Sequence, residues 1–155
     1  MSNNLLQLKV IIWNANSIRH KAIETFNFLK LHHISICLIT ETWLTNLDTL
    51  YSPDYKIYRV DRKNYPNHSS VRETGHGGVC ILVKNNIYHK LLPNIRLNVI
   101  EAIGVSVRTE IGDISFISAY FPGSTNPDKL RLFKSDIQSL INYTKLYFIG
   151  GDFNS

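Results

Sequence analysis

The chain has 155 residues, of which 44% are hydrophobic and 19% charged, and a formal net charge of +5. This length suits about one domain, and the composition is globular, which excludes a disordered or collagen-like chain. No apolar run approaches the roughly 20 residues of a membrane helix, and the N-terminal residues lack the features of a signal peptide. We therefore expect an intracellular protein without a membrane partner. Its positive charge fits ordinary solubility and slightly favours a polyanionic partner.

The first 40 residues show a strand, helix, strand pattern. Leu8 to Trp13 is an almost unbroken apolar run, which predicts a strand buried on both faces. Asn16 and Ser17 are candidate N-caps of a helix, because apolar residues recur at helical spacing from Ile18 to Leu29. Ile34 to Ile39 is a second apolar run. Two strands joined by a helix are expected to be parallel neighbours.

The remaining elements alternate in the same manner. Two strand patterns flank the short loop at Glu110 to Asp113, which predicts an antiparallel hairpin. Asn126 followed by Pro127 is typical of a helix start. These patterns indicate a mixed sheet system with helices packed outside it. The predicted strands span residues 79–83, 103–107, 114–118 and 146–149. Cys37 and Cys80 lie within apolar runs and are expected to be core residues without a disulfide.

The segment from Lys56 to Glu73 lacks apolar periodicity and mixes basic residues with tyrosines. Such a composition can follow a phosphate backbone and stack on bases. It is equally typical of a solvated surface loop, and both interpretations stay open. The candidate DNA contacts are Arg59, Arg62 and Lys63 in this segment, and Arg19 outside it.

Polar or ionisable side chains follow four of the predicted strands. Singly, each has an ordinary role as a loop cap, a turn residue or a lid on the core. Ligands of α/β sheets bind beyond the carboxyl ends of strands, so the shared position of these residues predicts a site. They are Asn14 and Asn16, Glu41, Tyr120, and Asp152 with Asn154.

The residue types at these positions suit the cleavage of a phosphodiester. Mg²⁺ prefers oxygen ligands, usually one or two carboxylates with water and a substrate phosphate, and Glu41 can supply a carboxylate. The reaction also requires an oriented water and charge neutralisation on the phosphoryl oxygens. Asp152 can orient or deprotonate the water, while Asn154 and Tyr120 can hold the phosphate.

Five motifs occur in a fixed order along nearly the whole chain: Trp13-Asn14-Ala15-Asn16-Ser17-Ile18, Glu41-Thr42-Trp43-Leu44, Gly77-Gly78-Val79, Ser118-Ala119-Tyr120-Phe121-Pro122 and Gly150-Gly151-Asp152-Phe153-Asn154. In these motifs the chain resembles the endonuclease/exonuclease/phosphatase superfamily, and most of all the endonucleases of non-LTR retrotransposons, relatives of apurinic/apyrimidinic endonucleases.

The resemblance implies a four-layer α/β sandwich of two mixed sheets flanked by helices, and a DNA-nicking activity that depends on Mg²⁺, with Mn²⁺ as a substitute. It assigns Glu41 to the metal and places Asn14 beside it. Tyr120 would contact the phosphate, and Asp152 with Asn154 would position the nucleophile. It further implies a nuclear location and a downstream reverse transcriptase in the same element.

Two departures from the superfamily pattern matter. Asn16 stands where repair endonucleases usually have Asp, so the metal would have fewer charged ligands. The superfamily also has a later Ser-Asp-His motif, whereas this sequence contains no Asp-His pair. We therefore expect residues 1–155 to form an incomplete domain, truncated at its C-terminus and weak or inactive alone.

Two other functions remain open on the sequence. One is a non-catalytic nucleic-acid-binding remnant of a mobile element, which a natural stop after Ser155 would favour. The other is a phosphatase of the same superfamily that acts on phosphoinositide or phospholipid head groups. The basic and aromatic segment argues against the phosphatase.

Overall fold

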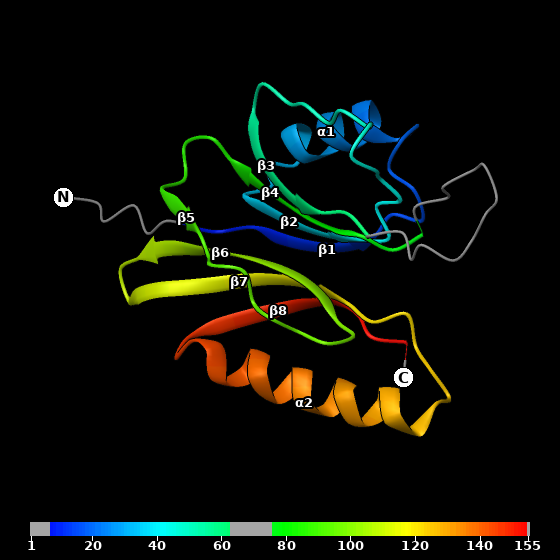
Figure 1. Ribbon diagram of the computed structural model, residues 1–155. Coiled ribbons are helices and arrows are strands. Elements are labelled where there is room, and N and C mark those ends of the chain that lie inside the picture. Colours follow the sequence, from blue (N-terminus) through cyan, green and yellow to red (C-terminus); the bar gives the residue numbers. More distant parts are fainter. Residues whose placement is uncertain (1–6, 63–75, 155) are drawn as a thin grey trace.

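The computed structural model describes residues 7–62 and 76–154. Two four-stranded sheets pack face to face, and one helix covers the outer face of each sheet (Figure 1). The helices are α1 (Ala22–Leu31) and α2 (Pro127–Tyr143). The predicted four-layer α/β sandwich of two mixed sheets is confirmed. Neither helix of the described chain has the length and apolarity to cross a membrane.

The first sheet has the strand order β1-β2-β4-β3. Its parallel pair, β1 and β2, is joined by α1, as the sequence predicted, and β4 runs antiparallel to both of its neighbours. The strands are β1 (Val10–Asn14), β2 (Ile36–Thr40), β3 (Tyr55–Val60) and β4 (Val79–Lys84).

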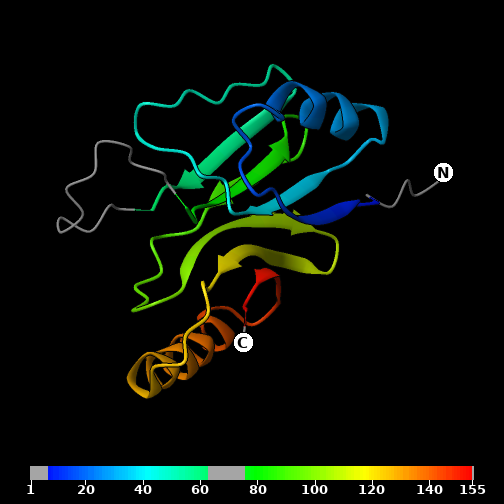
Figure 2. The same cartoon turned by 90° about the vertical axis from the view of Figure 1, so that its right-hand side faces the viewer.

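The second sheet has the order β5-β6-β7-β8 and likewise combines antiparallel strands with one parallel pair. The hairpin of β6 and β7 is antiparallel, and α2 connects β7 to its parallel neighbour β8. Each sheet therefore contains one strand–helix–strand unit (Figure 2). The strands are β5 (His89–Leu91), β6 (Glu101–Thr109), β7 (Gly112–Tyr120) and β8 (Tyr147–Asp152).

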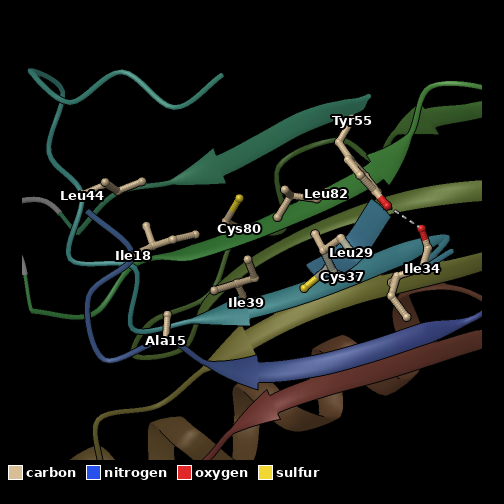
Figure 3. Close-up of a cluster of buried hydrophobic side chains, with 10 residues drawn as sticks. All are labelled: Ala15, Ile18, Leu29, Ile34, Cys37, Ile39, Leu44, Tyr55, Cys80 and Leu82. Carbon is tan, nitrogen blue, oxygen red and sulfur yellow. Dashed lines mark hydrogen bonds between the residues drawn. The ribbon is translucent and has the colours of Figure 1, made fainter. Parts of the chain in front are cut away.

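Three apolar cores lie between the four layers. Alternate residues of β2 point to opposite faces, so Cys37 and Ile39 pack toward α1, while Ile36 and Leu38 pack toward the second sheet. Figure 3 shows the core beneath α1, where the Tyr55 hydroxyl donates to the Ile34 carbonyl at 2.8 Å. Both cysteines are buried and free, as expected. The third core joins the second sheet to α2.

Strands β1 and β8 are edge strands on the same side of the sandwich (Figure 1). Ile12 on β1 is 48% exposed and Phe148 on β8 is 41% exposed. The prediction that the first strand is buried on both faces is therefore wrong. The reason is that, within residues 7–62 and 76–154, β1 has a hydrogen-bonded neighbour on one side only. The apolar run therefore lies at an edge of the sheet.

The start of α1 also differs from the prediction. Asn16 and Ser17 have positive φ values of 43° and 73° and do not cap a helix. Helix α1 begins after Lys21, whose side chain makes no capping hydrogen bond. The amides of Ser17 and Ile18 donate to the carbonyls of Glu41 and Thr42, at 2.9 and 3.1 Å. These tertiary hydrogen bonds hold Ser17 and Ile18 beside the end of β2, so the helix begins later in the sequence.

Candidate active site at the strand ends

Strand register brings the predicted residues to one edge of the sandwich. In the first sheet, Asn14 pairs with Thr40, the residue before Glu41. In the second sheet, Tyr120 pairs with Asp152. The strand ends of the two sheets meet where the Asn14 amide nitrogen Nδ2 donates to Asp152 Oδ2 at 2.7 Å. Residues 138 positions apart in sequence are thus in direct contact.

Local hydrogen bonds orient this pair further. Asp152 Oδ1 accepts from the backbone amide of Asn154 at 3.2 Å, and Asn14 Oδ1 accepts from the amide of Asn16 at 3.1 Å. The side chain of Asn154 donates to the carbonyl of Phe121 at 3.1 Å. Asp152 therefore accepts hydrogen bonds on both oxygens, and the turn after β8 is tied to the end of β7.

Glu41 follows β2 with a positive φ of 55°. Its Oε2 atom accepts from the backbone amide of Gly77 at 3.2 Å and from the indole Nε1–H of Trp43. The ring of Trp43 contacts that of His76 edge-on, with centroids 4.4 Å apart. One carboxylate oxygen is thus held by two donors, which fixes the direction of the other.

Tyr120 lies beside Glu41 and is only 5% exposed. Burial raises the pKa of the Tyr120 hydroxyl well above its usual value, and the neighbouring Glu41 carboxylate raises it further, against the opposing charge of Arg62. The phenol is therefore protonated at neutral pH. It can act as a hydrogen-bond donor in the site.

The structure adds one residue that sequence reasoning missed. Glu101 lies directly opposite Tyr120 across the β6–β7 hairpin. Its Oε2 atom accepts from the amide of Gly78 at 2.6 Å, and its Oε1 atom pairs with Arg62 Nε at 2.8 Å. A signal existed in the sequence, because Thr109 pairs with Gly112 across a two-residue loop. Counting back from that loop places Glu101 opposite Tyr120.

Two of the candidate DNA contacts, Arg19 and Arg59, have protein partners. Arg19 pairs with Asp48 at 2.9 Å. Arg59 donates to the carbonyls of Thr45 and Asp48 at 3.1 and 2.8 Å and pairs with Asp61 at 3.3 Å. These bonds fasten the chain after Glu41 to β3.

The segment expected to be a loop from residue 56 is in fact strand β3 up to Val60. Hydrogen bonding to β4 overrides the weak apolar pattern of this strand. Lys63, the remaining candidate, and the rest of that segment lie outside the described residues.

Among the described residues, no three His, Cys, Asp or Glu side chains come together as a ready-made metal cage. The site instead offers separate carboxylates, with Glu41 beside Tyr120 and Asp152 bonded to Asn14. This arrangement suits a cation that is held by one carboxylate, water and substrate, as is usual for Mg²⁺.

Comparisons with known proteins identify relatives of this chain. A probable RNA-directed DNA polymerase from transposon BS of Drosophila melanogaster is 31% identical over 148 residues, which are 96% of this chain and 15% of that protein. The chain thus spans about 15% of the length of this relative.

Two solved structures have the same fold. The catalytic domain of human Nocturnin superposes with a TM-score of 0.66 at 17% identity, over 97% of this chain and 66% of that one. The endonuclease domain of TRAS1, a telomere-specific non-LTR retrotransposon, gives a TM-score of 0.56 at 18% identity, over 96% and 60%. The model of the endonuclease/exonuclease/phosphatase family matches residues 11–155, and the chain belongs to that family.

Proposed function

We propose that the chain is the N-terminal part of a divalent-cation-dependent endonuclease that nicks DNA, as part of a non-LTR retrotransposon. The observation that carries the proposal is the bond between Asn14 and Asp152, beside Tyr120 and Glu41. It joins donors and acceptors from both sheets at the strand ends, where a phosphodiester can reach them. The family membership and the transposon relative support the same activity.

Glu41 is the proposed cation ligand. Its Oε2 atom is held by Gly77 and Trp43, so Oε1 is the oxygen left to face a cation. The donor set consists of oxygens alone, which fits Mg²⁺, with Mn²⁺ as a substitute. A bound cation would neutralise charge on the phosphoryl oxygens.

The remaining residues supply positioning and proton transfer. Asn14 and the backbone amide of Asn154 each hold one oxygen of Asp152, and a remaining lone pair of that carboxylate can accept a proton from a water that attacks the phosphorus. Tyr120 can donate its hydroxyl hydrogen to a phosphoryl oxygen, and the side-chain amide of Asn154, which uses one N–H for the Phe121 carbonyl, can hold another oxygen with its second N–H. Hydrogen bonds that strengthen as charge develops on the phosphoryl group are usually the largest catalytic contribution.

We further propose that the domain is completed by polypeptide carrying a Ser-Asp-His motif. The edge strands β1 and β8 offer free backbone groups and apolar side chains to added strands. A reverse transcriptase in the same polypeptide and a nuclear location would follow from the relationship to the transposon protein.

Among the candidate DNA contacts, Arg62 has the strongest geometric case. Its guanidinium lies beside Gly77 and is close enough to Tyr120 for its charge to lower the pKa of that hydroxyl. Arg19 and Arg59 are held by the loop at Thr45 and Asp48, so their proposed phosphate contacts compete with structural bonds.

The proposal is tested by nicking of supercoiled plasmid DNA in Mg²⁺, with chelator as a control. The 155-residue chain is compared with a longer version that continues through the Ser-Asp-His motif. We expect nicking by the longer version and little or none by the shorter one, because one carboxylate with neutral oxygens makes a loose site. A longer version that binds DNA without nicking it would favour the non-catalytic remnant. Phosphate release from phosphoinositides without nicking would favour the phosphatase.

A further inference from the structure

The Gly77–Gly78 turn lies between the two sheets at the site, and its conformation requires glycine. Both residues have positive φ values, 90° and 84°. A Cβ atom on Gly78 would clash with Thr42 Oγ1, and one on Gly77 would lie 3.0 Å from Glu101 Oε2. The carbonyls of Gly77 and Gly78 accept from the amides of Trp43 and Thr42, at 3.0 and 3.3 Å. The turn is therefore fastened to the segment that carries Glu41.

The two amides of this turn point to two different carboxylates. Gly77 donates to Glu41, from the first sheet, and Gly78 donates to Glu101, from the second sheet. The distances are 3.2 and 2.6 Å. Because the two amides belong to consecutive residues, the position of Glu101 restricts the direction from which Glu41 is bound.

Both carboxylate oxygens of Glu101 are already bonded within the protein. Oε2 is taken by Gly78 and Oε1 by Arg62, and the side chain is only 17% exposed. Glu41 differs, since both of its described donors, Gly77 and Trp43, reach the same oxygen. The two carboxylates thus have different roles, although they contact neighbouring residues.

We propose that Glu101 is a positioning residue, which holds the Gly77–Gly78 turn so that Glu41 presents Oε1 to the cation, and which holds Arg62 where its guanidinium can meet a phosphodiester. This inference rests on the proposed function, and it predicts an effect on cation binding in addition to any effect on cleavage. The required readout is therefore the affinity of the protein for a cation.

The fluorescence of Trp43 supplies that readout. Its indole donates to Glu41, so a paramagnetic Mn²⁺ bound by Glu41 would quench it. The chain has two tryptophans, and a Trp13→Phe background leaves Trp43 as the reporter. Titration with Mn²⁺ then gives the affinity of the site in the wild-type background and in each Glu101 variant.

Two uncharged variants of nearly equal size separate positioning from charge. Glu101→Gln keeps an oxygen that accepts from Gly78, whereas Glu101→Met does not, and both remove the same charge. We expect Mn²⁺ to bind the Met variant about tenfold more weakly than the Gln variant, the ratio that corresponds to one lost hydrogen bond. Glu110→Gln, in the exposed loop between β6 and β7, is the matched control and should bind as the background does.

Equal affinities of the Gln and Met variants would overturn the inference. If the Met variant does not fold, Glu101→Asp decides, because its shorter side chain keeps the charge and withdraws the acceptor. A background-like affinity in Glu101→Asp would also overturn it. The proposed function fails separately, and the inference with it, if the background protein shows no quenching that Glu41→Gln removes.

Discussion

The side-chain amide of Asn14 donates a 2.7 Å hydrogen bond to Asp152, and this bond joins the edge strand of one sheet to the edge strand of the other. Both residues end their strands. The bond therefore connects the two halves of the candidate site and also orients the carboxylate proposed to act on water.

Replacing this amide with a carboxylate should damage the site. In Asn14→Asp, two carboxylates would lie at hydrogen-bond distance, and ionising both is unfavourable. In the version extended through the Ser-Asp-His motif, we expect a loss of cleavage on the order of 10²-fold in single-turnover nicking and a lower melting temperature at neutral pH. The loss of stability should shrink in acid, where one of the two is protonated. Asn27→Asp, on the exposed face of α1, is the control, and equal behaviour of the two variants would refute the role of the bond.

The raised pKa of Tyr120, caused by burial and then by Glu41, predicts a stability change in alkali. A group whose pKa is higher in the folded state stabilises fully below its unfolded pKa, which is 10.0 here, and this contribution is lost as the pH rises above that value. Buried Cys37, with its pKa raised to about 12, acts in the same direction. Melting temperatures from about pH 9 to about pH 11 should fall more steeply in the wild type than in Tyr120→Phe. Parallel curves would contradict a buried phenol beside Glu41.

Asp136 on α2 is expected to hold residues 98–100, the segment that leads into β6 and Glu101. It is 1% exposed and accepts from the backbone amides of Asn98, Val99 and Ile100 at 2.7–3.0 Å. Asp136→Ala leaves these donors without an acceptor, and we expect it to lower the free energy of unfolding by about 3 kcal/mol. Urea unfolding measures this loss as a shift in midpoint. Asp128→Ala, at the exposed start of the same helix, should change stability far less.

Arg62 and Arg59 should differ as DNA contacts. If Arg62 meets a phosphate, Arg62→Gln reduces the slope of log affinity against log salt by about one. Arg59 is bonded to the carbonyls of Thr45 and Asp48, so Arg59→Gln should mainly lower the melting temperature. Fluorescence anisotropy of labelled DNA over a salt series measures both slopes. An unchanged slope in Arg62→Gln would remove it from the interface.

The sequence predicted most elements because their signals are local. Asn126 begins α2 as expected, and its side-chain oxygen accepts from the amide of Asp128 at 2.8 Å. Strand β3 was missed because it is an edge strand whose polar residues find partners elsewhere in the fold. Arg59, for example, bonds to a loop more than ten residues away. The start of α1 was wrong for a related reason, since distant carbonyls fix Ser17 and Ile18.

In the candidate site, the residues could be found from local sequence patterns, whereas their contacts could not. Asn14, Glu41, Tyr120 and Asp152 are strand-end residues, a property that apolar runs reveal. The pairing of Asn14 with Asp152 depends on how the two sheets stack, which no local pattern specifies. The role of Glu101 depends further on the Gly77–Gly78 turn contacting both sheets.

The central claim, that a Glu41-held cation supports phosphodiester cleavage at these strand ends, is tested most directly by one substitution. In the version of the protein extended through the Ser-Asp-His motif, Glu41→Gln preserves the shape of the side chain and removes the negative charge that is proposed to bind the cation. We expect Mg²⁺-dependent plasmid nicking to fall by on the order of 10²–10³-fold, while Glu110→Gln nicks as the wild type does. Nicking by Glu41→Gln at the rate of Glu110→Gln would contradict the account.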